Sequence, residues 1–194
     1  MSATLKTIGV TALASLILSP LASADTYKIS ADSGLTDIYS STINKTINVN
    51  PNPSGVESGT IEIDINTSTG AITMGGEDDI VLGDFNASVN FLGLTTWHAV
   101  ATGVSFNQSA TGTLDAMGKA TLTSGDGDPA IYVNTDFQGC SGLACRVIMN
   151  ADLDAKNYTV EIDFSDDYSS FTSTAVGYTS NGTKMTLVLN GVKQ

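Results

Sequence analysis

The sequence is poor in charged and aromatic residues. Only 14% of its 194 residues are Asp, Glu, Lys or Arg, and only 7% are aromatic. Eight basic residues stand against 20 acidic ones, which gives a formal net charge of −12. Such an acidic chain repels phosphate groups, so we expect no binding to nucleic acid. The hydrophobic share of 41%, without collagen or heptad repeats, excludes a disordered tail, collagen and a coiled coil.

The first 24 residues have the parts of a secretory signal peptide. Lys6 supplies the basic region, an apolar stretch runs from Ile8 to Leu18, and Ala22-Ser23-Ala24 forms an A-x-A cleavage site. We predict cleavage after Ala24, which removes Lys6 and leaves residues 25–194 with a net charge of −13. The apolar stretch is short for a membrane anchor, so we expect no transmembrane segment in the mature chain. The predicted location is secreted or periplasmic, in a Gram-negative bacterium.

Alternating apolar and polar residues predict β-strands along the mature chain. Residues 59–65 place Ile61, Ile63 and Ile65 on one face, and residues 158–164 repeat the pattern. Further candidate strands lie at 26–31, 42–49, 71–74, 79–83, 85–91, 94–106, 109–115, 118–123, 130–137, 145–153, 169–178 and 185–189. We interpret this pattern as roughly ten to twelve short strands, which predicts an all-β, single-domain antiparallel β-sandwich or β-barrel.

Two segments depart from the strand pattern. Gly34–Ser41 is the one place where we expect a short helix. Residues 50–58 are expected to form a long loop, because Pro51 and Pro53 cannot donate hydrogen bonds to a sheet. The predicted single domain therefore has an N-terminal strand pair at 25–49, this loop, and a main sheet at 59–194. A membrane-spanning barrel is disfavoured, because the chain has few aromatic residues for interfacial girdles.

The chain has two cysteines, Cys140 and Cys145. In an oxidising compartment they are expected to form a structural disulfide, which closes a small loop and adds about 2 kcal/mol of stability. The alternative is a redox pair or half of a metal site. That alternative is disfavoured, because the spacing is not C-x-x-C and no His follows.

The only His and the only Trp are neighbours in a predicted strand. In residues 94–100, alternation places His98 on one face and Trp97 on the other. One imidazole cannot build a multi-His metal site, and no G-x-S-x-G motif supplies a nucleophile. We therefore expect His98 to be a hydrogen-bonded structural residue and Trp97 to lie in the core. Exposure of both beside a concavity would instead indicate a ligand-binding surface.

Acidic residues share the polar faces of two predicted strands. Glu62 and Asp64 are two positions apart, as are Glu161 and Asp163. We interpret both pairs as part of a solvated surface that opposes aggregation. The alternative is a pair of catalytic carboxylates, which requires one buried acid with a raised pKa.

One acidic loop has the residues for a calcium site. In Asp126-Gly127-Asp128, two carboxylates flank a flexible glycine, which makes Asp126 and Asp128 candidate calcium ligands. The EF-hand pattern is incomplete, so an ordinary turn is favoured. No other cofactor is expected.

Small polar side chains dominate the predicted strand faces, and no catalytic motif occurs. These features favour a non-catalytic secreted or surface β-protein, an adhesin, matrix or fibre component that self-associates or binds a surface polysaccharide. The alternative is a lipocalin-like carrier of a small apolar ligand, because Ala99, Ala101 and Gly103 are small residues on the predicted Trp97 face. A secreted hydrolase is the third hypothesis.

Overall fold

The computed structural model describes residues 24–76, 78–127, 129–143, 145 and 153–194. Fourteen strands belong to one antiparallel sheet: β1 (Asp25–Ile29), β2 (Gly34–Ser40), β3 (Lys45–Asn50), β4 (Val56–Asn66), β5 (Ala71–Met74), β6 (Asp78–Leu82), β7 (Phe85–Asn90), β8 (Leu94–Phe106), β9 (Ala110–Thr113), β10 (Lys119–Ser124), β11 (Ile131–Ser141), β12 (Asp154–Phe164), β13 (Ser170–Thr179) and β14 (Lys184–Lys193). The prediction of an all-β fold is confirmed, with more strands than expected. Among the described residues, no helix has the length and apolar character needed to cross a membrane.

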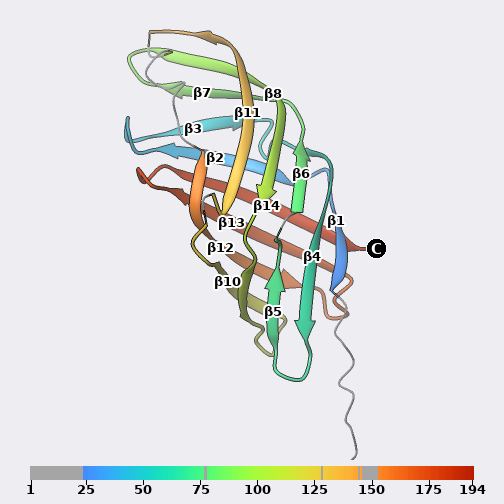
Figure 1. Ribbon diagram of the computed structural model, residues 1–194. Helices are drawn as coiled ribbons and strands as arrows, with labels where there is room; N and C mark the ends of the chain where they lie inside the picture. The colour runs from blue at the N-terminus through green and yellow to red at the C-terminus, as the bar shows by residue number, and fades with distance from the viewer. Residues whose placement is uncertain (1–23, 77, 128, 144, 146–152) are drawn as a thin grey trace, which may run out of the picture.

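Eight strands close into an antiparallel barrel, in the order β1-β14-β13-β12-β10-β9-β5-β4. Closure comes from β1, which pairs with β14 on one side and with β4 on the other. Tyr27 of β1 lies opposite Ile61 and Lys193, so the N-terminal strand joins segments from distant parts of the chain. In Figure 1 this closed barrel occupies the lower part of the view.

Six further strands, β2, β3, β6, β7, β8 and β11, form what we call the upper extension. From β14 the pairing continues through β2, β3, β7, β8 and β11, and β11 returns to β12. β6 bridges β4 and β8. The upper extension therefore pairs with the closed barrel at β4, β12 and β14, and Figure 1 shows it above the barrel.

The helix expected at Gly34–Ser41 is wrong, because this segment forms β2. Leu35 and Ile38 are both buried, and their spacing of three residues resembles a helical repeat. The pairing of β2 with β14 shifts register between Thr186 and Leu187, which lets both side chains face the interior from a strand. Tertiary pairing overrides the local pattern here. The strand expected at 145–153 lies largely outside the described residues.

The interior is filled by the apolar faces of the strands. Tyr27, Ile61, Leu122 and Tyr158 are fully buried, with an exposed fraction of 0%. Aromatic rings pack against one another in this interior, where the centroid of the Tyr27 ring lies 5.3 Å from that of Phe171. Outward positions carry mainly Thr, Ser, Asn, Asp and Glu, so the polar chemistry of the barrel lies on its outer surface.

One expectation about the interior, the side of β8 on which Gly103 lies, is wrong because β8 contains a bulge. The predicted alternation placed Gly103 on the Trp97 face, but the pairing with β11 shifts register between Asn134 and Asp136. Trp97 is buried on the N-terminal side of the shift, and Val104 is buried on its C-terminal side. Gly103 is only half-buried. An extra residue in one strand reverses which side chains point inward, and residue-by-residue alternation cannot detect it.

Candidate functional site

Threonines two residues apart recur on three strands of the closed barrel. The pattern T-x-T occurs in β9 at 111–113, in β10 at 121–123 and in β13 at 172–174. In each strand both threonines point outward, and the residue between them faces the interior. The sheet thus presents rows of hydroxyl groups to solvent.

A shallow concavity of about 570 Å³ lies on this outer face. Its lining comes from β9, the turn after it, β10, β12, β13 and β14. The polar side chains that line it are the buried Ser173 and the outward Thr113, Asp115, Lys119, Thr121, Glu161, Asp163, Thr172 and Thr174. We call this feature the outer concavity.

Strand register arranges the lining in two rows. In the first row, Thr121 lies opposite Glu161, and Glu161 lies opposite Thr174. Val188 follows Thr174 and ends this row. Neighbouring strands are about 4.8 Å apart, so the row from Thr121 to Val188 spans about 14 Å. The second row runs parallel to it, two residues along each strand.

The second row contains an ion pair. Lys119 lies opposite Asp163, and its ammonium group contacts the Asp163 carboxylate. This contact raises the pKa of Lys119. Thr172 continues the row across β13. The charge of Asp163 is therefore balanced within the protein.

Asp115 borders the outer concavity from the turn between β9 and β10. Its Oδ1 accepts hydrogen bonds from the backbone N–H groups of Lys119 and Met117, at 2.9 and 2.8 Å. These two bonds, the one from Lys119 first, lower the pKa of Asp115. This carboxylate shapes the turn.

Glu161 differs from the other two acids of the outer concavity. It is exposed at the centre of the first row, and no described residue forms a hydrogen bond or ion pair with it. The hydroxyls of Thr121 and Thr174 on either side likewise have no hydrogen-bond partner among the described residues. We call a group open when it has no hydrogen-bond or ion-pair partner among the described residues. One open carboxylate thus lies between two open hydroxyl groups.

The structure places His98 and Trp97 on opposite faces of β8, as the alternation predicts. Trp97 is buried, with an exposed fraction of 4%, whereas His98 is exposed. The His98 ring lies on the outer surface, with Nδ1 3.1 Å from Oδ1 of Asn86 and Nε2 3.7 Å from Oδ2 of Asp84. Among the described residues these are its partners, so no Ser, Thr or Cys side chain is bonded to the imidazole. His98 and Trp97 do not share a surface.

Two polar atoms remain unpaired inside the upper extension. Trp97 Nε1 and Thr95 Oγ1 are buried and have no hydrogen-bond partner within the described part of the chain. Both belong to the inward face of β8, where Ala87 and Val89 of β7 lie directly opposite. Buried polar groups without partners are rare in native proteins, so this pair of atoms is unusual.

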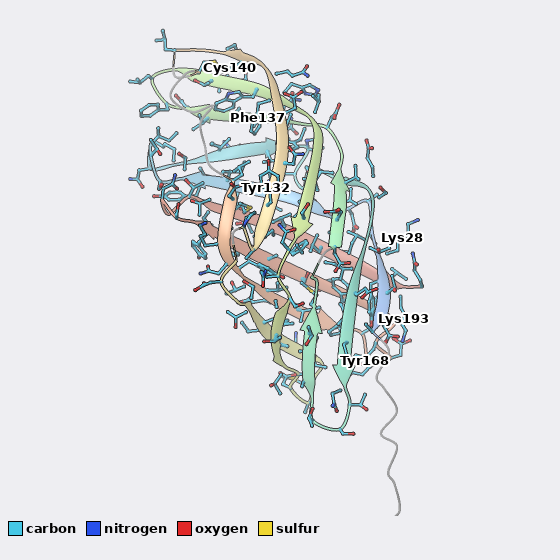
Figure 2. The ribbon with its side chains drawn as sticks, in the orientation of Figure 1. Lys28, Tyr132, Phe137, Cys140, Tyr168 and Lys193 are labelled. Carbon is cyan, nitrogen blue, oxygen red and sulfur yellow. A yellow bond between two sulfur atoms is a disulfide. The ribbon has the colours of Figure 1, made fainter. Side chains whose placement is uncertain are left out.

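Cys140 and Cys145 lie at disulfide distance, with their sulfur atoms 2.05 Å apart. Cys140 lies near the end of β11 and Cys145 follows that strand, and neither lines the outer concavity. Figure 2 shows Cys140 and Phe137 at the opposite end of the molecule from Tyr168.

The calcium candidates lie in the turn after β10. Asp126 is exposed, and its Oδ1 accepts a hydrogen bond from Nδ2 of Asn157 at 3.3 Å. Asp128 lies outside the described residues. Within the described ranges, no group of three or more His, Cys, Asp or Glu side chains is placed to hold a metal ion.

The outward acids bear on the hydrolase hypothesis. A general acid needs a carboxyl group in apolar surroundings, but Glu161 is exposed and Asp163 is paired with Lys119. Asp78 is different, because burial raises its pKa. Its Oδ2 accepts a hydrogen bond from the backbone N–H of Glu62 at 3.4 Å. We interpret this contact between β6 and β4 as structural.

Sequence reasoning identified Glu161 and Asp163 as outward acids but missed the threonines and Lys119 beside them. The repeated T-x-T pattern was the available signal for the hydroxyl rows. Lys119 had no such signal, because its pairing with Asp163 depends on the register between β10 and β12.

No family model, curated protein or solved structure matches the chain.

Proposed function

We propose that this protein works outside the cytoplasm as a non-catalytic β-protein that binds a surface or polysaccharide through its outer face, in adhesion, matrix or fibre formation. The observation that carries this proposal is the outer concavity, where open hydroxyl groups and one open carboxylate line a hollow of about 570 Å³. A ligand with many hydroxyl groups finds both donors and acceptors there. The signal-peptide pattern and the close pair Cys140–Cys145 support an oxidising location.

The arrangement of polar groups favours binding over catalysis. The exposed His98 is bonded to Asn86 and lies on β8, whereas the outer concavity is built from β9, β10, β12, β13 and β14. The acids of the outer concavity lack apolar surroundings. Loss of a hydrolytic activity in both His98→Ala and a variant lacking Glu161 and Asp163 would contradict this proposal.

A binding experiment with matched variants tests the proposed function. Purified mature protein is incubated with washed bacterial envelopes and with a panel of insoluble polysaccharides, and the retained fraction is measured. The double variant Thr121→Val/Thr174→Val removes two lining hydroxyls while keeping side-chain shape. We expect it to lower retention.

The control is Thr111→Val/Thr123→Val, which removes outward hydroxyls from β9 and β10 at positions that do not line the outer concavity. We expect retention to stay at the level of the unsubstituted protein. A protein that stays a strict monomer at high concentration and is retained by no envelope or polysaccharide would refute the proposed function.

A carrier of a small ligand is the second candidate function, favoured by the unpaired Trp97 Nε1 and Thr95 Oγ1. A mostly apolar ligand with one or two oxygen or nitrogen atoms would satisfy both groups. Native mass spectrometry of protein isolated from its own compartment tests this function. The carrier would show a bound small molecule that Trp97→Phe releases, and a bare mass for the native protein would dismiss it.

A further inference from the structure

The outer concavity has an uneven distribution of charge, which points to the chemistry of its ligand. Three carboxylates and one ammonium group line it. Asp163 is balanced by Lys119, and Asp115 is held by two backbone N–H groups. Glu161 alone has neither kind of partner among the described residues. The uncompensated negative charge therefore lies in the middle of the first row.

The hydroxyl groups on either side of Glu161 define the rest of the recognition surface. Thr121 and Thr174 flank it directly across the neighbouring strands, and each hydroxyl both donates and accepts hydrogen bonds. Thr172 adds a third hydroxyl in the second row. From Thr121 to Thr174, polar groups repeat at strand spacing over about 10 Å, which suits an extended chain of hydroxylated units better than one small molecule.

We propose that the outer concavity binds a polysaccharide that carries free amino groups, with an ammonium group of the ligand on Glu161 and its hydroxyl groups on Thr121, Thr172 and Thr174. This inference rests on the proposed function and names its ligand class. A protonated amine forms a charge-assisted hydrogen bond with a carboxylate, which is stronger than a neutral one.

The charge of the whole molecule favours the same ligand. A net charge of −12 attracts cationic chains and repels polysaccharides rich in uronic acid or sulfate. A metal ion is a poorer occupant of the outer concavity, because Asp163 and Asp115 already have partners. An apolar ligand would leave the hydroxyls and Glu161 without hydrogen bonds on burial.

The test compares two soluble oligosaccharides of equal length, an oligomer of glucosamine and the corresponding oligomer of N-acetylglucosamine. Binding to the mature protein is measured by calorimetry at mildly acidic pH, where the amines are protonated. A hydrogen bond to a charged group corresponds to roughly tenfold or more in affinity, so we expect at least that preference for the glucosamine oligomer. Added salt should reduce the preference.

Variants locate the interaction. Glu161→Gln keeps the shape of an exposed side chain and should abolish the preference for the amine. Thr121→Val/Thr174→Val should weaken binding of both oligomers. The matched control is Glu62→Gln, which neutralises an outward acid on β4, outside the outer concavity, and should change neither affinity. A thermal melt of each variant confirms that it folds.

The possible results separate this inference from the proposed function. Equal affinity for the two oligomers, or an unchanged preference in Glu161→Gln, would overturn the ligand class. If glucosamine oligomers do not bind, but envelopes retain the protein and Thr121→Val/Thr174→Val lowers retention, the ligand class is wrong and the proposed function stands. If neither oligomers nor envelopes bind, both fail.

Discussion

Leu92 shows how a single residue can be strained in a hairpin turn. It lies between β7 and β8 with φ at +53°, and 69% of its side chain is exposed. The left-handed conformation costs a residue with a bulky side chain roughly 1–2 kcal/mol, while Asn tolerates it better. The backbone conformation of Leu92 therefore costs free energy, and burial of its side chain offsets little of that cost.

Replacing Leu92 by Asn should stabilise the protein. We expect Leu92→Asn to raise the free energy of unfolding by about 1 kcal/mol, measured by urea denaturation, because Asn relieves the left-handed strain. Leu94→Asn is the control, since Leu94 is similarly exposed but has no left-handed backbone. Equal effects of the two substitutions would show that apolar exposure, and not φ, sets the stability at Leu92.

Asp167 shows how one carboxylate organises the turn between β12 and β13. Its Oδ1 accepts hydrogen bonds from the hydroxyl of Ser169 at 2.7 Å, the N–H of Ser169 at 3.0 Å and the hydroxyl of Ser165 at 2.9 Å. These bonds, led by the Ser169 hydroxyl, lower the pKa of Asp167 to about 2. Because the folded pKa lies below the unfolded value, ionised Asp167 stabilises the fold above about pH 4.

That stabilisation should disappear in acid. As the pH falls from about 4 through about 2, Asp167 becomes protonated in the folded state, so the difference in unfolding free energy between the unsubstituted protein and Asp167→Asn should shrink. Urea denaturation at a series of pH values measures it. Asp166→Asn is the control for removing a charge from the same turn, because Asp166 has no hydrogen bond with a described residue. A constant difference for Asp167→Asn would contradict the prediction.

At the scale of elements, the spacing of apolar residues predicted most strands. β5 and β8 have the expected bounds, and β4 and β12 contain the alternating residues that predicted them. The secondary structure of β2 was predicted wrongly, and so was the inward face of the second half of β8. Both errors have the same cause. Both involve shifts in register, and a bulge depends on the partner strand as well as on local sequence.

Gly112 shows why two strands beneath the outer concavity approach closely. A Cβ atom at this position would lie 2.5 Å from the carbonyl oxygen of Thr121 on β10, and the obstructing atom is backbone. Only glycine fits without displacing a strand. The threonines on either side of Gly112 can then face outward beside those of β10.

Gly112→Ala should push β9 from β10. We expect it to lower the free energy of unfolding by about 1–3 kcal/mol, as overpacking does, and to weaken binding at the outer concavity. Gly125→Ala is the matched control, because a Cβ atom there meets nothing within 4 Å. Equal stability of the two variants in urea would show that the β9–β10 contact is looser than the structure indicates.

At the scale of the whole molecule, closure of the barrel depends on β1. Tyr27 lies between β4 and β14, is fully buried, and donates a hydrogen bond from its hydroxyl to the backbone oxygen of Tyr168 at 2.8 Å. Its ring packs against Phe164 of β12 and Phe171 of β13. One residue near the N-terminus thus connects four strands.

Removing the Tyr27 side chain should weaken the pairing of β1 with β4 and β14 that closes the barrel. Tyr27→Ala is expected to lower the free energy of unfolding by about 3–5 kcal/mol, the range for truncating a buried aromatic residue. Hydrogen exchange should show lost protection in both β1 and β4. Tyr178→Ala is the control, because Tyr178 is 47% exposed on β13 and its loss should change stability by about 0.5 kcal/mol or less. Similar costs for the two variants would mean that closure does not depend on Tyr27.

The sequence by itself determined the all-β class, most strand positions, the pairing of Cys140 with Cys145 and the opposite faces of Trp97 and His98. These features follow from alternation and short-range spacing, which are local properties of the chain. Tertiary structure decided that eight strands close through β1, that β2 is a strand, and that Lys119 neutralises Asp163 while Glu161 stays open. Each of these depends on which distant strands pair and in what register, and a shift of one residue would have exchanged the inward and outward faces.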